Sequence, residues 1–317
     1  MGPFFAILKN VIIFVALAIP GYLLSKKQII KPENCGALSN CLTYIGVPFL
    51  IFSGTLQMNF TAEFLKSAII AVGVFTLTSI IIYFLSIPLT AKEKDHSVSS
   101  MMRFCMIFSN NGFLGLPLAY AAFPEEIAAI SFLIIMNLLQ NVITIDVGKS
   151  LVSSDTKSKI NVKSLLLSPA LIAFVLGIIL NLVKITSYLP EVNDFSNHLK
   201  NIVTPISMTI LGVKLGGVKV KELFSAPKTY YVSFIKLIVL PIIGVALAFA
   251  CVKIFGLSND LVLATFISFA MPVAGLASTI ADKFGGDEKG AVYYTLGSTV
   301  LSVITIPVLY LLLSFIM

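Results

Sequence analysis

Long runs of apolar residues, separated by short polar segments, cover almost the whole chain. A helix needs roughly 20 mostly apolar residues to cross the hydrocarbon core of a bilayer. Backbone groups in lipid must pair within their own segment, so each run predicts a helix rather than a strand. The chain is therefore expected to be an all-α integral membrane protein with ten transmembrane helices, at about residues 4–24, 36–57, 64–91, 98–123, 126–148, 164–184, 196–217, 227–254, 259–282 and 287–316.

Composition supports a membrane protein over a soluble one. Hydrophobic residues make up 57% of the chain and charged residues 12%, whereas a soluble domain is about 25% charged. The net charge of +7 is not spread as the basic stripe that binds nucleic acid, because the lysines lie at the ends of apolar runs. The cysteines show no paired spacing, and we interpret them as packing residues.

The distribution of basic residues predicts how the helices are oriented. With ten spans, 16 of the 22 basic residues fall in or beside the loops of one side, and one lies inside a span. Basic residues concentrate in cytoplasmic loops. The prediction is a multi-pass protein of the cell inner (plasma) membrane with both termini extracytoplasmic. The opposite side holds five basic residues, which are Lys9, Lys66, Lys184, Lys200 and Lys253.

Similar short segments recur in the two halves of the chain. Val142–Ile145 has the same sequence as Val303–Ile306, and Pro117 in the fourth span corresponds to Pro272 in the ninth. An odd number of spans per copy requires the second copy to be inverted, which is a known arrangement in carriers. We therefore predict a five-helix repeat at residues 1–148, a cytoplasmic linker at 149–163 and a second repeat at 164–317.

Polar and helix-breaking residues interrupt the fourth span. Asn110 and Asn111 are followed by Gly112, Gly115 and Pro117 in an otherwise apolar segment. Proline removes a backbone donor and clashes with the preceding turn, so the helix is expected to break. Irregular backbone at membrane depth is tolerated where it lines a cavity. The cluster therefore predicts a substrate site; a simple proline kink is the alternative.

The ninth span has a comparable interruption at Met271, Pro272 and Gly275. Two interrupted helices at matching positions are the best sequence indication of a carrier's binding site. The exposed N-termini of half-helices favour an anion there. For Pro272 taken alone, a kink without a ligand is an equally good interpretation.

The basic residue inside a span is Lys236, in the eighth. An ionisable group within the bilayer is a functional hypothesis by default. Lys236 could neutralise a carboxylate substrate or pair with a titrating acid. Alternatively, its long side chain could reach back to the membrane surface.

The fifth span carries three amides, Asn137, Gln140 and Asn141. Their spacing places them on one helical face. They either bind substrate or bond to neighbouring helices, and the sequence favours neither.

Several of these segments together resemble the auxin efflux carrier family, which includes plant auxin exporters and bacterial malate and malonate permeases. Asn110–Leu118 resembles the family's fourth-helix motif. The resemblance extends over nearly the whole chain, through Gly46–Pro48, Leu211–Leu215, Lys236 with Pro241, and Ala270–Pro272.

The resemblance implies two inverted five-helix repeats. Spans 1, 2, 6 and 7 would form a scaffold, and spans 3–5 and 8–10 a transport domain in which spans 4 and 9 cross at their breaks. Asn110 would contact the substrate carboxylate, and Pro117 and Pro272 would hold the crossover. Elevator-type alternating access and a homodimer are implied as well.

The expected function is secondary transport of small organic anions, namely mono- or dicarboxylates such as malate, malonate or auxin-like acids. Transport would be uncoupled or coupled to H+ or Na+, without a cofactor. A sodium-coupled bile-acid-type symporter of the same ten-helix architecture is one alternative, and a membrane receptor that binds a ligand without moving it is another. No catalytic cluster, phosphate loop or metal-ligand set predicts an enzyme, and no nucleic-acid partner is expected.

Overall fold

Helices account for almost all regular structure in the protein. The computed structural model describes residues 3–153 and 167–317. Within these residues, six helices are long and apolar enough to cross a membrane. The structure is thus that of a multi-pass membrane protein, as expected. The six helices are Phe4–Lys26, Pro32–Thr55, Ala62–Thr90, Ile127–Val152, Pro227–Phe255 and Glu288–Ser314.

The remaining four expected spans are shorter or divided, so the count of ten is not confirmed. The fourth span consists of α5 (His96–Ile107) and α6 (Leu116–Ala122), with a π-helical turn before α6. The sixth is represented by α9 (Pro169–Leu182), and part of that prediction lies outside the described residues. The seventh span is divided into α11 (Glu191–Lys200) and α12 (Val203–Gly216). The ninth span is divided into α16 (Asp260–Ala270) and α17 (Ala277–Phe284). Hydropathy averaged over a window does not reveal such interruptions, because a single proline or glycine hardly changes the average.

The chain forms two compact units, and each draws on both halves of the sequence. Among the described residues, the first unit contains 3–64, 112–134 and 167–219. The second contains 65–111, 135–153 and 220–317. The units are defined by contacts in space, whereas the predicted repeats are defined by sequence similarity between the two halves of the chain. The division into repeats at 1–148 and 164–317 stays a prediction.

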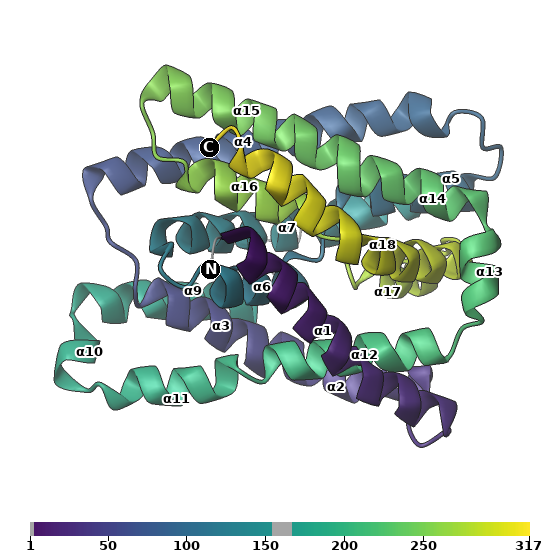
Figure 1. Cartoon of the computed structure of the whole chain (residues 1–317), viewed down its shortest axis with the longest axis horizontal. Coiled ribbons are helices and arrows are strands. Elements are labelled where there is room, and N and C mark those ends of the chain that lie inside the picture. The colour runs from purple at the N-terminus through teal and green to yellow at the C-terminus, as the bar shows by residue number, and fades with distance from the viewer. Residues whose placement is uncertain (1–2, 154–166) are drawn as a thin grey trace. The chain divides into compact units, whose positions relative to one another are not determined.

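The first unit is built around a close crossing of α1 (Pro3–Lys26) and α12, which Figure 1 shows. A Cβ atom added to Gly21 would lie 2.2 Å from the carbonyl oxygen of Thr209, and one added to Gly212 would lie 2.0 Å from that of Ala18. Small residues allow helix backbones in membranes to approach this closely. The crossing is therefore closed by backbone contact and has no room for a side chain at either glycine.

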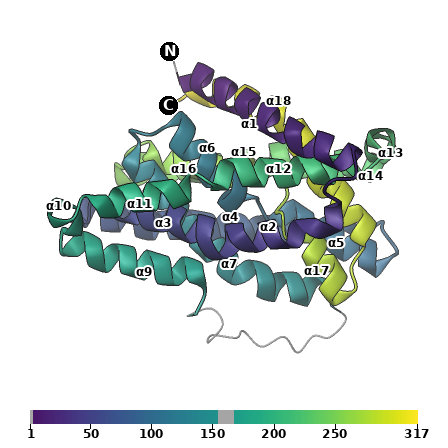
Figure 2. The same cartoon turned by 90° about the horizontal axis from the view of Figure 1, so that it is seen from below.

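A second pair of helices in the first unit, α3 (Val47–Thr55) and α9, lies side by side (Figure 2). The Asn181 side chain on α9 donates to the carbonyl oxygens of Thr55, Leu56 and Met58 at 3.1, 2.8 and 3.0 Å. The last carbonyls of a helix have no partner within the helix, and this amide supplies one. The other helices of the unit are α2 (Cys35–Cys41), α6, α10 (Ile185–Tyr188) and α11, with the first part of α7 (Ile127–Val152).

The second unit surrounds α16. Every residue of this helix from Leu261 to Ala270 is buried, and α15 packs beside it (Figure 1). A helix that is apolar and buried on all sides occupies the centre of its unit. The surrounding helices are α4 (Ala62–Thr90), α5, most of α7 (Ile127–Val152), α13 (Val220–Ser225), α14 (Pro227–Phe234), α15 (Leu240–Phe255), α17 and α18 (Glu288–Ser314).

Three π-helical turns in the described residues share one sequence feature, which is a proline two residues after the turn. Proline has no N–H to offer the carbonyl four residues earlier, and its ring clashes with that carbonyl. Widening the preceding turn relieves both problems, and single π-turns are frequent at functional sites. The turns and their prolines are Leu42–Gly46 with Pro48, Asn111–Gly115 with Pro117, and Ile235–Val239 with Pro241.

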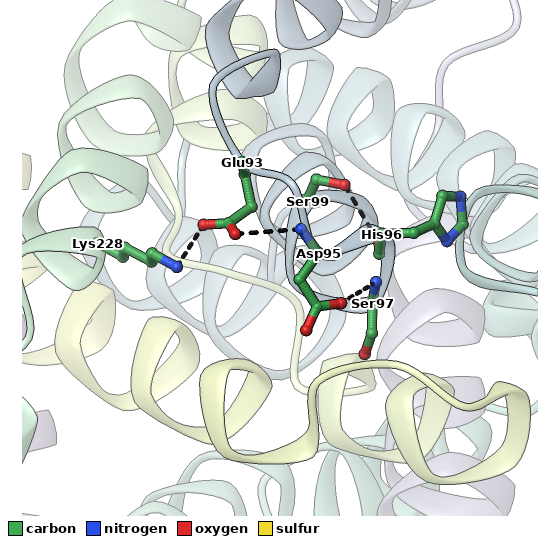
Figure 3. Close-up of polar contacts among 6 residues, drawn as sticks. All are labelled: Glu93, Asp95, His96, Ser97, Ser99 and Lys228. Atoms are coloured by element: carbon green, nitrogen blue, oxygen red, sulfur yellow. Dashed lines mark hydrogen bonds and ion pairs between the residues drawn. The ribbon is translucent and has the colours of Figure 1, made fainter.

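The start of α5 is fixed by polar contacts (Figure 3). The Asp95 carboxylate caps the helix by accepting from the Ser97 N–H at 2.9 Å. Just before it, Glu93 forms an ion pair with Lys228 on α14. The hydrogen bond from Lys228 holds the pKa of the Glu93 carboxyl below its usual value. These contacts anchor one end of α5 to α14, and the other end of α5 leads into the site described next.

Candidate functional site

The broken regions after α5 and α16 pair with each other. The Asn110 N–H donates to the Pro272 carbonyl oxygen at 2.8 Å, and the Ala274 N–H donates to the Phe108 carbonyl oxygen at 3.0 Å. The pairing is antiparallel and forms a single β-bridge. Backbone groups freed by the two breaks thus satisfy one another, which buried polar backbone requires. The predicted interruptions of the fourth and ninth spans are confirmed, and the two bridged segments, 108–110 and 272–274, both belong to the second unit.

Lys236 reaches into this bridge from the π-turn Ile235–Val239. Its side chain is fully buried, and its Nζ donates to the Ser109 Oγ and, at 3.3 Å, to the Phe269 carbonyl oxygen. Phe269 lies in the last turn of α16, where the helix dipole favours a cation. The ammonium therefore lies at the crossing itself. The alternative in which Lys236 extends to the membrane surface is wrong for this structure.

No carboxylate balances this ammonium within the described residues. Lys236 is the one charged side chain among the buried residues there, and its hydrogen-bond partners are a hydroxyl and a carbonyl oxygen. Buried charges in proteins are ordinarily paired, because an unpaired charge in an apolar surrounding is costly. The alternative of a titrating acid as its partner finds no support in these contacts.

Amides on α7 and after α5 hold the bridge in place. Gln140 donates from Nε2 to the Ser109 carbonyl oxygen at 2.6 Å, and its Oε1 accepts from Asn111 Nδ2 at 3.2 Å. Asn111 Nδ2 also donates to the Ser268 Oγ on α16 at 2.9 Å. We call Ser109, Asn111, Gln140, Lys236 and Ser268 the crossover cluster. It joins four segments that are far apart in the sequence.

Some polar atoms at the cluster have no hydrogen-bond partner. Asn111 Oδ1 is buried and unpaired, and so are both amide atoms of Asn137, which lies one helical turn before Gln140 on α7. The Asn110 side chain is partly exposed and makes no hydrogen bond within the described residues. Buried polar groups in folded proteins are nearly always paired. These amides are therefore available to a ligand.

The three amides predicted to share one face of the fifth span are not equivalent. Asn137 and Gln140 are buried, whereas Asn141 is exposed. Gln140 forms hydrogen bonds with the segment after α5, which agrees with the interpretation that these amides bond to neighbouring parts of the protein. Asn137 forms no such hydrogen bond. Asn141 does not join the cluster within this chain.

The other predicted site residues differ in burial and in the unit to which they belong. Met271 and Pro272 are buried and Gly275 is partly exposed. Gly112 is partly exposed, and Gly115 and Pro117 are buried; these three belong to the first unit, which begins again at residue 112. Pro272 enters the bridge through its carbonyl oxygen, the one backbone polar group that proline retains.

Three serines at the site were not among the predicted residues. Ser109 and Ser268 belong to the crossover cluster, and the Ser298 Oγ on α18 accepts from the Val273 N–H at 3.1 Å. Ser109 directly precedes the amides of the fourth span, which is a signal that could have found it. Ser268 and Ser298 share their apolar helices with other hydroxyl residues, such as Thr265 and Ser302, and serine is common in membrane helices as a packing residue.

The chemistry offered by this site is binding. It combines one ammonium group with amides and hydroxyls in a buried setting. Among the residues that the structure describes, no group of three or more His, Cys, Asp or Glu side chains could hold a metal ion. Apolar helices interrupted around a buried polar centre are the construction of membrane carriers.

Comparison with known proteins assigns the family. The chain belongs to the membrane transport protein family, whose model matches residues 5–310. An uncharacterized transporter of Methanocaldococcus jannaschii is 27% identical over 290 residues, which cover 88% of this chain and 90% of that protein. The resemblance to the auxin efflux carrier family is thereby confirmed. Both findings indicate a membrane transporter.

Proposed function

We propose that the protein is a secondary carrier of small organic anions, in which Lys236 neutralises the carboxylate of the cargo. The observation that carries this proposal is the fully buried amino group of Lys236, which has no carboxylate partner among the described residues. A carboxylate would bring the missing charge, and charge-assisted hydrogen bonds between ammonium and carboxylate are strong. Small mono- or dicarboxylates such as malate, malonate or auxin-like acids are the cargo class.

Asn110 completes the proposed site. It follows Ser109, whose hydroxyl accepts from Lys236, and its own amide has no partner among the described residues. An amide N–H that donates to a carboxylate adds orientation to the charge supplied by lysine. Asn110 therefore binds the cargo, while Pro272 keeps the backbone irregular where the cargo binds.

An elevator-type movement is part of the proposal. All hydrogen bonds of the crossover cluster lie inside the second unit. A site contained in one compact body can be carried by that body without being taken apart. The predicted membrane orientation, the homodimer and the choice between uncoupled and H+- or Na+-coupled transport stay predictions.

Uptake into proteoliposomes tests the function. Purified full-length protein is reconstituted, and uptake of radiolabelled malate, malonate, lactate and indole-3-acetate is measured above protein-free liposomes. We expect uptake of at least one of these acids. Folded protein that takes up none of them contradicts the proposal, and binding without uptake indicates the receptor alternative. Uptake that requires external sodium supports the symporter alternative.

A matched pair of lysine variants links uptake to the site. Lys66 on α4 also donates to a carbonyl oxygen at a helix end, that of Phe255 at 3.3 Å, but it is exposed. Lys236→Met should lower uptake about 100-fold, because a desolvated charge pair is worth several kcal/mol. Lys66→Met should transport as the wild type does. Equal uptake by both variants would remove Lys236 from the site.

A further inference from the structure

The charge of the crossover cluster sets a limit on its cargo. Lys236 supplies the one buried charge among the described residues. Arg103, on α5, is partly exposed and donates to the Ser86 Oγ at 3.2 Å, and Lys228 is paired with Glu93. When Lys236 is protonated, the cluster therefore has a charge of one. A cargo with one negative charge is neutralised there, whereas a second negative charge stays unpaired at a high cost.

The unpaired atoms at the cluster favour a neutral donor as the second polar group of the cargo. Gln140 is occupied on both amide atoms, and Asn111 uses its Nδ2 twice. What is left unpaired is Asn111 Oδ1, an acceptor, and the side-chain amides of Asn110 and Asn137, each with one acceptor and one donor group. A carboxylate can only accept hydrogen bonds, so it would leave these amide oxygens without a donor. A hydroxyl can donate to Asn111 Oδ1.

We propose that the cargo binds as a singly charged carboxylate whose second polar group is a neutral hydrogen-bond donor, such as a hydroxyl. This inference rests on the proposed function, because it takes Lys236 as the counter-charge of the cargo. The single carboxylate binds Lys236, and the neutral group donates to the amide oxygen of Asn111 or of Asn137. A dicarboxylic acid enters with its second carboxyl protonated, since the protonated group is a donor.

One competing arrangement explains the same unpaired oxygens. Amide oxygens are also ligands for a cation, and a sodium ion bound with the cargo would supply a second positive charge. A dianion would then be neutralised by Lys236 and the ion together. Binding of diacids that depends on sodium is therefore an outcome that overturns the proposal.

The experiment compares acids that differ in charge at equal length. Malonate, succinate and glutarate are each paired with the ω-hydroxy monocarboxylic acid of the same chain length. Dissociation constants are measured with detergent-solubilised full-length protein in potassium buffer at about pH 7.5, where both carboxyls of the diacids are ionised. At least one hydroxy acid should bind about 10-fold more tightly than its diacid, since unpaired buried groups discriminate strongly. The affinity of the diacid should rise as the pH is lowered toward about 5.

A pair of amide variants tests the part played by the donor. Asn137→Leu removes the unpaired buried amide, and Asn141→Leu changes an exposed amide on the same helix. Asn137→Leu should lose several-fold affinity for the hydroxy acid but keep its affinity for the unsubstituted monocarboxylate of equal length. Asn141→Leu should bind both acids as the wild type does.

Each result has a defined meaning. A diacid that binds at about pH 7.5 as tightly as its hydroxy acid, with or without sodium, overturns the single-charge cargo and leaves the carrier function standing. Equal losses for both monocarboxylates in Asn137→Leu overturn the donor assignment. If no acid binds and the uptake panel is also negative, the proposed function fails together with this inference.

Discussion

The two units of the protein each contain a crossing of helices, and the two crossings are closed by different means. In the first unit, Gly21 and Gly212 allow the backbones of α1 and α12 to touch. In the second unit, the segments after α5 and α16 are held by backbone hydrogen bonds, two amides and the Lys236 ammonium. Among the described residues, the first crossing leaves one hydroxyl unpaired, that of Ser25, whereas the second leaves a charge and several amide atoms unmatched. Function is therefore expected at the second crossing and rigidity at the first.

The largest expected effect is a loss of folding at the first crossing. In Gly212→Leu, the new side chain would meet the Ala18 carbonyl group, a backbone atom that cannot move aside. Overpacking of this kind costs about 3 kcal/mol, so folded yield and thermal stability in detergent should fall sharply. Gly36→Leu is the control, because a Cβ at Gly36 has no neighbour within 4 Å. Equal stability of the two variants would show that the backbone contact does not support the fold.

The two adjacent amides of the second crossing should separate binding from stability. Asn110→Ala should lower uptake at least about 10-fold without changing the unfolding temperature, because its side chain has no partner in the described part of the protein. Asn111→Ala should lower the free energy of unfolding by about 1–2 kcal/mol, because Gln140 and Ser268 lose a partner. The measurements are uptake in proteoliposomes and thermal unfolding. If Asn110→Ala and Asn111→Ala show the same uptake and the same thermal stability, the assignment of Asn110 to binding and Asn111 to stability is wrong.

The smallest expected effect concerns the ion pair at the start of α5. The pKa of Glu93 is lowered in the folded protein by its hydrogen bond to Lys228. A lowered carboxyl pKa stabilises the fold above the ordinary glutamate pKa, about 4.3, and this contribution is lost as the pH falls through the folded value. Because Glu93 is at the surface, Glu93→Gln should leave stability at about pH 7 nearly unchanged. A marked drop in unfolding temperature at that pH would show that the ion pair does more than anchor one helix end.

The order of apolar, polar and helix-breaking residues predicts the fold well where the structure depends on residues close together in the sequence. Proline and glycine mark both interruptions, since the missing N–H of proline breaks the hydrogen-bond ladder wherever it occurs. Lys236 stands out because a lysine within an apolar run is rare. Span counting works less well, since hydropathy is averaged over a window and passes across short breaks such as that between α16 and α17.

What the pattern does not contain is which residues meet in space. The hydroxyl that accepts from Lys236 comes from Ser109, 127 positions away. Helical periodicity places Asn137, Gln140 and Asn141 on one face, but a face is broad, and neighbouring helices cover only part of it. Asn141 is left exposed for that reason, and only the packing of α7 against its neighbours decides it.

The π-turn at Ile235–Val239 has a consequence for how the site could be lost or remodelled. Such a turn is a one-residue insertion in the helix, and each residue of an α-helix rotates the chain by about 100°. Deleting one residue between Lys236 and Pro241 would restore regular winding and turn the lysine away from Ser109 relative to the rest of the helix. The position of the charge is thus encoded by the number of residues before the proline as much as by the lysine itself. A deletion or insertion of one residue would change the direction in which the Lys236 side chain points, and it would leave the apolar faces of α15 unchanged.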